Sequence, residues 1–81
     1  MRLTIIPVDD AVYVDGVCRL PLDLSPCNIP SDVHALQWDQ DSGWIEFNDM
    51  PKTPNEDISE LPEWALACVG VWEAWVSSFA E

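Results

Sequence analysis

A C-terminal run, in which large apolar side chains recur at helical spacing, constrains the fold most strongly. At about 100° per residue, the large apolar residues of positions 61–79 fall in one arc of roughly 160°, and small or acidic residues fill the rest. Among the large apolar residues of this segment, only Leu66 lies outside the arc. The arc contains Leu61, Trp64, Ala65, Cys68, Val69, Val71, Trp72, Trp75, Val76 and Phe79. So much apolar surface in a chain of 81 residues must hold the fold together, bind another molecule, or both.

The N-terminal part of the chain predicts β-structure. Runs rich in β-branched and aromatic residues at 3–6, 11–14 and 17–20 alternate with turn residues. Between the second and third runs, Asp15-Gly16 is a strong signal for a two-residue hairpin turn, because both central positions of the favoured turn need positive φ. We therefore expect a small antiparallel meander here.

A second hairpin is expected from Val33–Asp39 and Trp44–Asn48, joined by a turn over residues 40–43. Strict alternation along both strands separates a core-facing set from Trp44 and Glu46, which point the other way. The core-facing set is Leu36, Trp38, Ile45 and Phe47.

The remaining segments divide one domain over residues 1–81. Residues 21–32 form a proline-rich loop inside a β-rich part that ends at residue 48, and residues 49–58 form a second loop. A helix over 59–80 follows, with Ser59 as its cap and Pro62 in its first turn. The predicted fold class is α+β: a small antiparallel sheet of two hairpins, with four to five strands, and one long amphipathic C-terminal helix packed on a face.

Charge restricts the partners. Fifteen Asp and Glu against three Lys and Arg give a net charge of −12, which disfavours direct binding to nucleic acid or to a membrane surface. A basic protein surface is compatible with this charge, and the extreme case is a mimic of nucleic acid. Scattered acidic residues also serve solubility alone. The acidic residues nearest the second hairpin are Asp39, Asp41, Glu46, Asp49, Glu56 and Asp57.

No residue pattern predicts catalysis, a cofactor or a metal. The single histidine, His34, lies on an expected strand without a nucleophile or carboxylate at a known motif spacing, so a structural or surface role is favoured. The turn around Asp41 lacks the ligand spacing of a calcium loop. Cys18, Cys27 and Cys68 show neither zinc-site spacing nor a disulfide framework, and Cys68 is expected to pack as a small apolar residue. We expect a non-enzymatic protein.

The tryptophans supply the candidate contact surface. Trp38 and Trp72 are expected in the core. Trp64 and Trp75 lie with Val71 at one edge of the helical arc, where they are either part of the core or part of an interface. The predicted partner-binding residues are Trp44, Trp64, Val71, Trp75 and Phe79.

Three segments resemble small proteins encoded in the tail modules of long-tailed bacteriophages, described as tail-fibre assembly or tail-associated proteins. The segments are IIPVDDAVYVDG near the N-terminus, IPSDVHALQWDQDSGWIEF in the centre and PNEDISELPEWALACVGVWEAW near the end. Together they cover most of the chain. The resemblance implies a phage protein with a role in tail assembly.

Two functions of different classes follow. The first is a phage protein-binding module that acts in tail or tail-fibre assembly, in a chaperone-like manner, through its Trp-rich helix face. The second is an acidic inhibitor of a host protein such as a defence nuclease, a motility factor or a regulatory factor, with nucleic-acid mimicry as one possible mode of action. Homodimerisation through the C-terminal helix is a third possibility. The expected location is the host bacterial cytoplasm or the virion tail, since neither a signal peptide nor a membrane span is present in the sequence.

Overall fold

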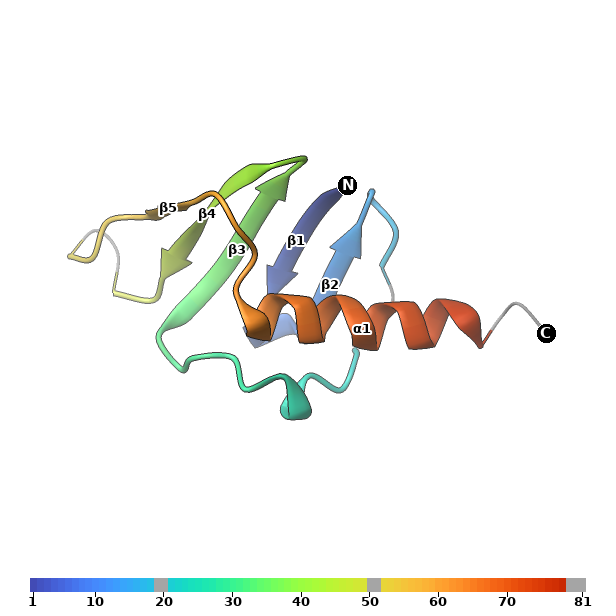
Figure 1. The fold of residues 1–81 in the computed structure, drawn as a ribbon. Coiled ribbons are helices and arrows are strands. Elements are labelled where there is room, and N and C mark those ends of the chain that lie inside the picture. Colours follow the sequence, from blue (N-terminus) through green and yellow to red (C-terminus); the bar gives the residue numbers. More distant parts are fainter. Residues whose placement is uncertain (19–20, 50–51, 79–81) are drawn as a thin grey trace.

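The fold is an antiparallel sheet with one helix on one of its faces, as Figure 1 shows. The computed structural model describes residues 1–18, 21–49 and 52–78, so the predicted contact residue Phe79 lies outside the described residues. The strands are β1 (Arg2–Ile6), β2 (Ala11–Val14), β3 (Val33–Asp39), β4 (Ser42–Phe47) and β5 (Glu56–Ile58). The helices are α1 (Glu63–Ser77) and two short 3-10 helices, η1 (Pro7–Asp9) and η2 (Ser25–Cys27). The expected α+β class is confirmed.

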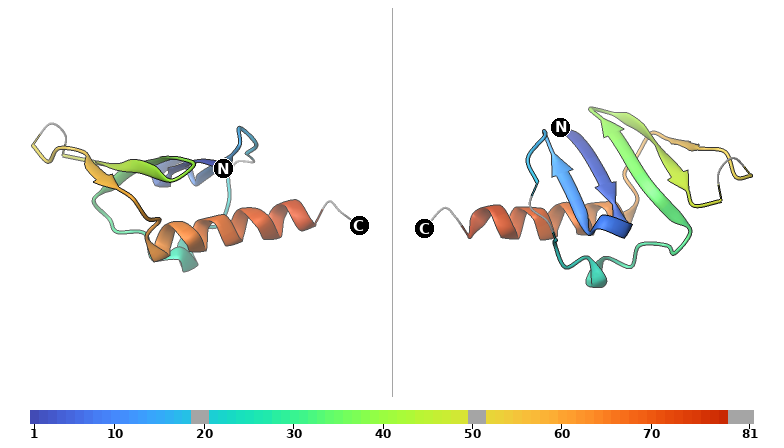
Figure 2. Two further views of the ribbon diagram at one scale, coloured as in Figure 1. Left: turned by 45° about the horizontal axis from the view of Figure 1, so that its top comes forward. Right: turned by 180° about the vertical axis from the view of Figure 1, so that it is seen from behind.

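The sheet has the order β2-β1-β3-β4-β5, and every neighbouring pair is antiparallel. α1 and the loop that carries η2 lie on the same side of it (Figure 2). The core fills the space between, because alternate side chains of each strand point toward the helix. The largest side chains removed completely from solvent are Leu3, Ile5, Val12, Leu36 and Cys68.

The first hairpin has the predicted turn but not the predicted third strand. Asp15 and Gly16 both have positive φ, 51° and 82°, and Val14 and Val17 exchange backbone hydrogen bonds of 3.1 and 3.0 Å. Beyond this turn Val17 forms only an isolated bridge. Pro21 has no N–H to donate, and Leu22 bonds to the Asp10 carbonyl at 2.9 Å. The strand expected over 17–20 is therefore wrong for its described residues.

The second hairpin is tighter than predicted. Asp39 pairs directly with Ser42, so the turn is Gln40-Asp41 rather than residues 40–43. Gly43 lies inside β4, where a Cβ atom would collide with the Gln37 carbonyl oxygen and come within 2.8 Å of the Trp38 Cα. Because Gly43 has no side chain, β3 and β4 can approach each other closely here. In the sequence, a glycine in this place looks like part of a turn, so the predicted turn extended to residue 43.

A fifth strand occupies part of the expected loop over 49–58. β5 pairs with β4 through Gly43↔Ile58 and Trp44↔Asp57. Two of its three residues are acidic, which is typical of a short edge strand and not of a strand interior. This composition explains why its sequence resembles a loop.

The helix begins later than predicted. α1 starts at Glu63 with Pro62 at the N-cap, and no side chain caps it. Residues that precede a proline disfavour the α conformation, so Leu61 cannot easily be helical. Ser59 is therefore not the cap, and the expected helix over 59–80 is corrected to Glu63–Ser77 for the described residues.

Candidate protein-binding surface

The sheet face opposite α1, here called the outer face, is open over most of its area in the described part of the chain (Figure 2). One residue from each strand forms a row across it, here called the outer row. This row consists of Tyr13, Thr4, Gln37, Trp44 and Asp57. Trp44 keeps 41% of its surface exposed, whereas its chain neighbour Ile45 keeps 6%. The predicted opposite orientation of these two side chains is confirmed.

Hydrogen bonds fix the orientation of side chains in the outer row. The Trp44 indole Nε1–H donates to the Glu46 carboxylate Oε2 at 2.8 Å, and the Thr4 hydroxyl donates to Gln37 Oε1 at 2.8 Å. An exposed ring held by a carboxylate on its own strand loses less conformational freedom when a partner covers it. Trp44 is therefore suited to contact with another protein.

The outer face is hollowed on both sides of Arg2. Between β1 and β2, a hollow of about 490 Å³ is bordered by Arg2, Thr4 and Tyr13. A smaller one of about 120 Å³ lies between Arg2 and Trp44. Both are shallow and mix polar with aromatic groups, which is the character of a contact surface more than of an enclosed ligand site.

One end of the outer face is closed. Ala11 and Ala35 have outward positions in the register, yet they expose only 0% and 4% of their surface. η1 contacts β3 in this fold. The accessible area therefore lies toward Arg2 and Trp44.

The helix tryptophans belong to a different surface. Trp64, Val71, Trp72 and Trp75 are all half-buried and packed against the core. The Trp72 and Trp75 rings meet edge to face at 6.3 Å and 64°, and Trp72 Nε1–H donates to the Val17 carbonyl oxygen at 2.9 Å. Trp72 is thus less buried than predicted, and the edge residues Trp64, Val71 and Trp75, for which core and interface were both open, pack on the core as Trp72 does. Trp44 lies on the opposite side of the sheet from all of them.

The most exposed large apolar side chains of α1 are not its tryptophans. Leu66, the one large apolar residue outside the predicted arc, is 55% exposed, and Val76, which is inside it, is 37% exposed. Cys68 is completely buried, as expected for a small apolar residue. The apolar arc therefore serves mainly to close the core.

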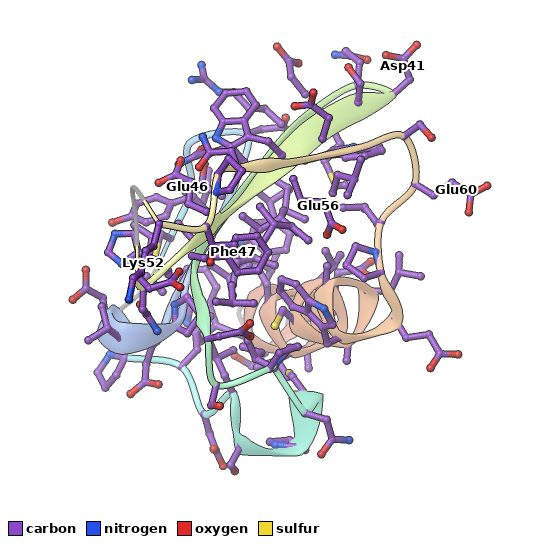
Figure 3. The ribbon with its side chains drawn as sticks, turned by 90° about the vertical axis from the view of Figure 1, so that its left-hand side faces the viewer. Asp41, Glu46, Phe47, Lys52, Glu56 and Glu60 are labelled. Carbon is purple, nitrogen blue, oxygen red and sulfur yellow. The ribbon has the colours of Figure 1, made fainter. Side chains whose placement is uncertain are left out.

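The six predicted acidic residues do not form one surface. Asp57 pairs with Trp44 and so lies on the outer face, whereas Glu56 pairs with the inward-facing Ile45. Figure 3 shows Glu46 on one side of the sheet and Glu56 on the other, the side on which Glu60 lies. Asp39 is opposite Arg2 in the register, and Asp41 is at the turn. Asp49 accepts a hydrogen bond of 2.6 Å from the Thr53 hydroxyl.

The described residues contain no group of three or more His, Cys, Asp or Glu that could hold a metal ion. His34 is exposed on β3. Within the same residues, no helix has both the length and the apolar character needed to cross a membrane.

Comparisons with known proteins add no relative. No family model matches the chain, and neither the curated proteins nor the solved structures contain a match. The resemblance to phage tail proteins therefore rests on the three sequence segments quoted above. Function has to be inferred from the surfaces of the fold.

Proposed function

We propose that this protein is a non-enzymatic binding module that presents the outer face of its sheet, around Trp44, to a basic surface of a partner protein. One observation carries the proposal: a tryptophan that is 41% exposed is held in place by Glu46 on the open part of the outer face. Tryptophan is enriched among the residues that dominate binding energy at protein interfaces. The outer face replaces the Trp-rich helix as the candidate interface, because the helix tryptophans pack on the core.

Charge complementarity identifies the partner's chemistry. The chain carries a net charge of −12, and Glu46 and Asp57 flank Trp44 on the outer face. An arginine or lysine of the partner can lie over the indole ring and pair with one of these carboxylates. The partner surface is therefore expected to be basic at its centre.

The resemblance to tail-module proteins favours a tail or tail-fibre component as this partner. Binding during assembly, in a chaperone-like manner, requires no active site. The alternative, an acidic inhibitor of a host nuclease, motility factor or regulatory factor, uses the same charge but not the indole. A homodimer through α1 is less favoured, because most of the apolar arc is already packed.

The test compares two exposed apolar side chains on opposite sides of the molecule. Tail and tail-fibre proteins of a phage that encodes this chain are purified and titrated with it by isothermal titration calorimetry. Trp44→Ala is expected to weaken the complex at least about tenfold, as the loss of a central tryptophan does. Leu66→Ala, on the solvent side of α1, is the matched control and should leave the dissociation constant unchanged.

Circular dichroism should show both variants folded, because neither side chain is in the core. A complex that weakens with Leu66→Ala and not with Trp44→Ala would place the interface on the helix. Repeating the titration from 50 to 500 mM salt tests the alternative. Over this range of salt, the affinity of a nucleic-acid mimic for its target is expected to fall about a thousandfold, whereas the affinity of a complex that docks around Trp44 should fall much less.

A further inference from the structure

Two cysteines that are distant in the sequence meet in the core. Cys27 ends η2 and Cys68 lies in α1, and Figures 1 and 2 show η2 beside the N-terminal half of the helix. α1 and η2 contact each other, and the two thiols interact in the core, with exposures of 3% and 0%. Both cysteines are free thiols. The sequence spacing contains no indication of this pair, because η2 and α1 approach each other only in the folded chain.

The loop that carries Cys27 is held firmly against the helix. Leu22 and Leu24 are buried in the core just before η2. The Asp23 carboxylate then accepts hydrogen bonds from the Ser25 hydroxyl at 2.6 Å and from its backbone N–H at 3.1 Å. These two bonds, the hydroxyl first, lower the pKa of the Asp23 carboxyl. Cys27 is therefore presented to Cys68 by a local structure that is already ordered.

A hollow gives small molecules a route to this pair. It measures about 290 Å³ and lies between η2 and the start of α1, with Cys27, Trp64 and Ala67 among its lining residues. Cys68 does not line it. A reagent that enters the hollow consequently reaches Cys27 first.

We propose that Cys27 and Cys68 are a site of oxidative cross-linking, at which hydrogen peroxide converts the two thiols into a disulfide that ties η2 to α1. The Cys27 sulfur attacks the peroxide, the O–O bond breaks, and a sulfenic acid and water form. The Cys68 sulfur then displaces the hydroxyl group as a second water. Two S–H bonds are lost, one S–S bond forms, and the peroxide takes up the two electrons.

Protonation supports this order of events. Burial, followed by the hydrogen bond to Cys27, raises the pKa of the Cys68 thiol to about 12. Cys68 therefore keeps its proton near neutral pH, and the thiolate is the reactive form of cysteine. Cys68 is accordingly poorly suited to attack the peroxide first, and its proton leaves with the displaced hydroxyl group as the second water.

Trypsin can identify the cross-link directly. Cleavage after Arg2, Arg19 and Lys52 puts the three cysteines on separate fragments. Cys18 is in fragment 3–19, Cys27 in 20–52 and Cys68 in 53–81. The folded protein is treated with hydrogen peroxide, remaining thiols are alkylated, and the digest is analysed by mass spectrometry. Fragments 20–52 and 53–81 are expected to be joined, with Cys18 alkylated.

An unfolded control separates folded-state geometry from chance pairing. In urea, loop closure favours cysteines that are near in sequence, so the Cys18–Cys27 pair should dominate. Cys18→Ala should leave the native cross-link unchanged, and Cys68→Ala should abolish it. The cross-linked protein should melt about 10 °C or more above the reduced protein, and dithiothreitol should reverse this shift.

Three results would overturn the proposal. One is a native digest in which fragments 3–19 and 20–52 are the main joined pair, as in urea. Another is oxidation of Cys27 in the folded wild-type protein without any link to fragment 53–81. The third is a link between fragments 20–52 and 53–81 that forms no more often in the folded protein than in urea.

Discussion

At the scale of single residues, the two tryptophans of the second hairpin differ in burial. Trp38 exposes 7% of its surface and Trp44 41%, although the two tryptophans are on paired strands. Trp38 is opposite Gly43 in the register, so it faces the helix, whereas Trp44 is opposite Gln37 and faces away. Because side chains alternate along a strand, a shift of one residue in either strand would turn that strand's tryptophan to the opposite face.

The Cys68 thiol makes stability depend on alkaline pH. Its pKa is raised from 9.0 to about 12 in the folded protein, first by burial. Above pH 9 the unfolded chain releases this proton while the folded chain retains it, so rising pH favours unfolding. The free energy of unfolding should therefore fall steadily between pH 9 and pH 11 because of this group, by an amount on the order of a few kcal/mol.

Urea titrations between pH 8 and pH 11 measure this effect. The matched control is Cys68→Ala, which retains every other group that titrates in the same range. Its stability should decline less steeply than that of the wild type. Parallel curves for the two proteins would show that Cys68 does not cause the decline.

At the scale of elements, two glycines illustrate opposite constraints. Gly43 is inside β4, where any Cβ would strike the backbone of β3. Gly70 is exposed within α1, and a Cβ there would have no heavy atom within 4 Å. The first position needs glycine because of a close approach, and the second has no such need.

Alanine substitutions at these two positions should therefore change the free energy of unfolding in opposite directions. Gly43→Ala is expected to lower the free energy of unfolding by about 2 kcal/mol or more, because the strands must separate to admit the methyl group. Gly70→Ala should raise it by roughly 0.5 to 1 kcal/mol, since alanine loses less backbone entropy in a helix. Chemical denaturation of the two single variants tests this pair. The same sign for both would contradict the steric account of Gly43.

At the scale of the whole molecule, charge and shape act together. The chain measures 46 × 24 × 20 Å along its principal axes and carries a net charge of −12. Acidic residues occur on both faces of the sheet, so they repel one another through the fold in addition to any partner interaction. Self-repulsion of this kind opposes the compact state.

Salt should consequently stabilise the free protein. Raising sodium chloride from 10 to 300 mM is expected to increase the melting temperature by a few degrees, because screening reduces repulsion between exposed carboxylates. Glu73→Lys, at an exposed helix position, moves the net charge two units toward zero and should make this increase smaller. Thermal melts followed by circular dichroism measure both effects. A melting temperature that does not respond to salt would argue against net repulsion.

Local patterns allowed much of the fold to be predicted from the sequence. Period-two alternation in residues 33–39 identified Leu36 and Trp38 as buried, and the Asp15-Gly16 pair identified its turn. Both signals depend only on residues close together in the chain. The start of the helix was missed because the restriction that Pro62 places on Leu61 outweighed the capping preference of Ser59.

The candidate surface was less predictable. The sequence indicated that Trp44 points outward, but grouped it with Trp64 and Trp75, which lie across the sheet from it. It also grouped Glu46 with Glu56, which pairing with β4 assigns to opposite faces. Whether two side chains share a face depends on strand register and on which face the helix covers, and neither is a local property.

By itself, then, the sequence determined an acidic α+β chain with two hairpin regions and one apolar helix, because hydrophobic period and turn residues act locally. Only the tertiary structure decided that β1 lies between β2 and β3, that β5 completes the edge, and that Cys27 touches Cys68. It also decided that the helix tryptophans are used in packing while Trp44 stays exposed. These outcomes depend on which surfaces, distant in the sequence, bury each other. The free energy of that burial is gained only when the whole chain folds, so no local pattern contains it.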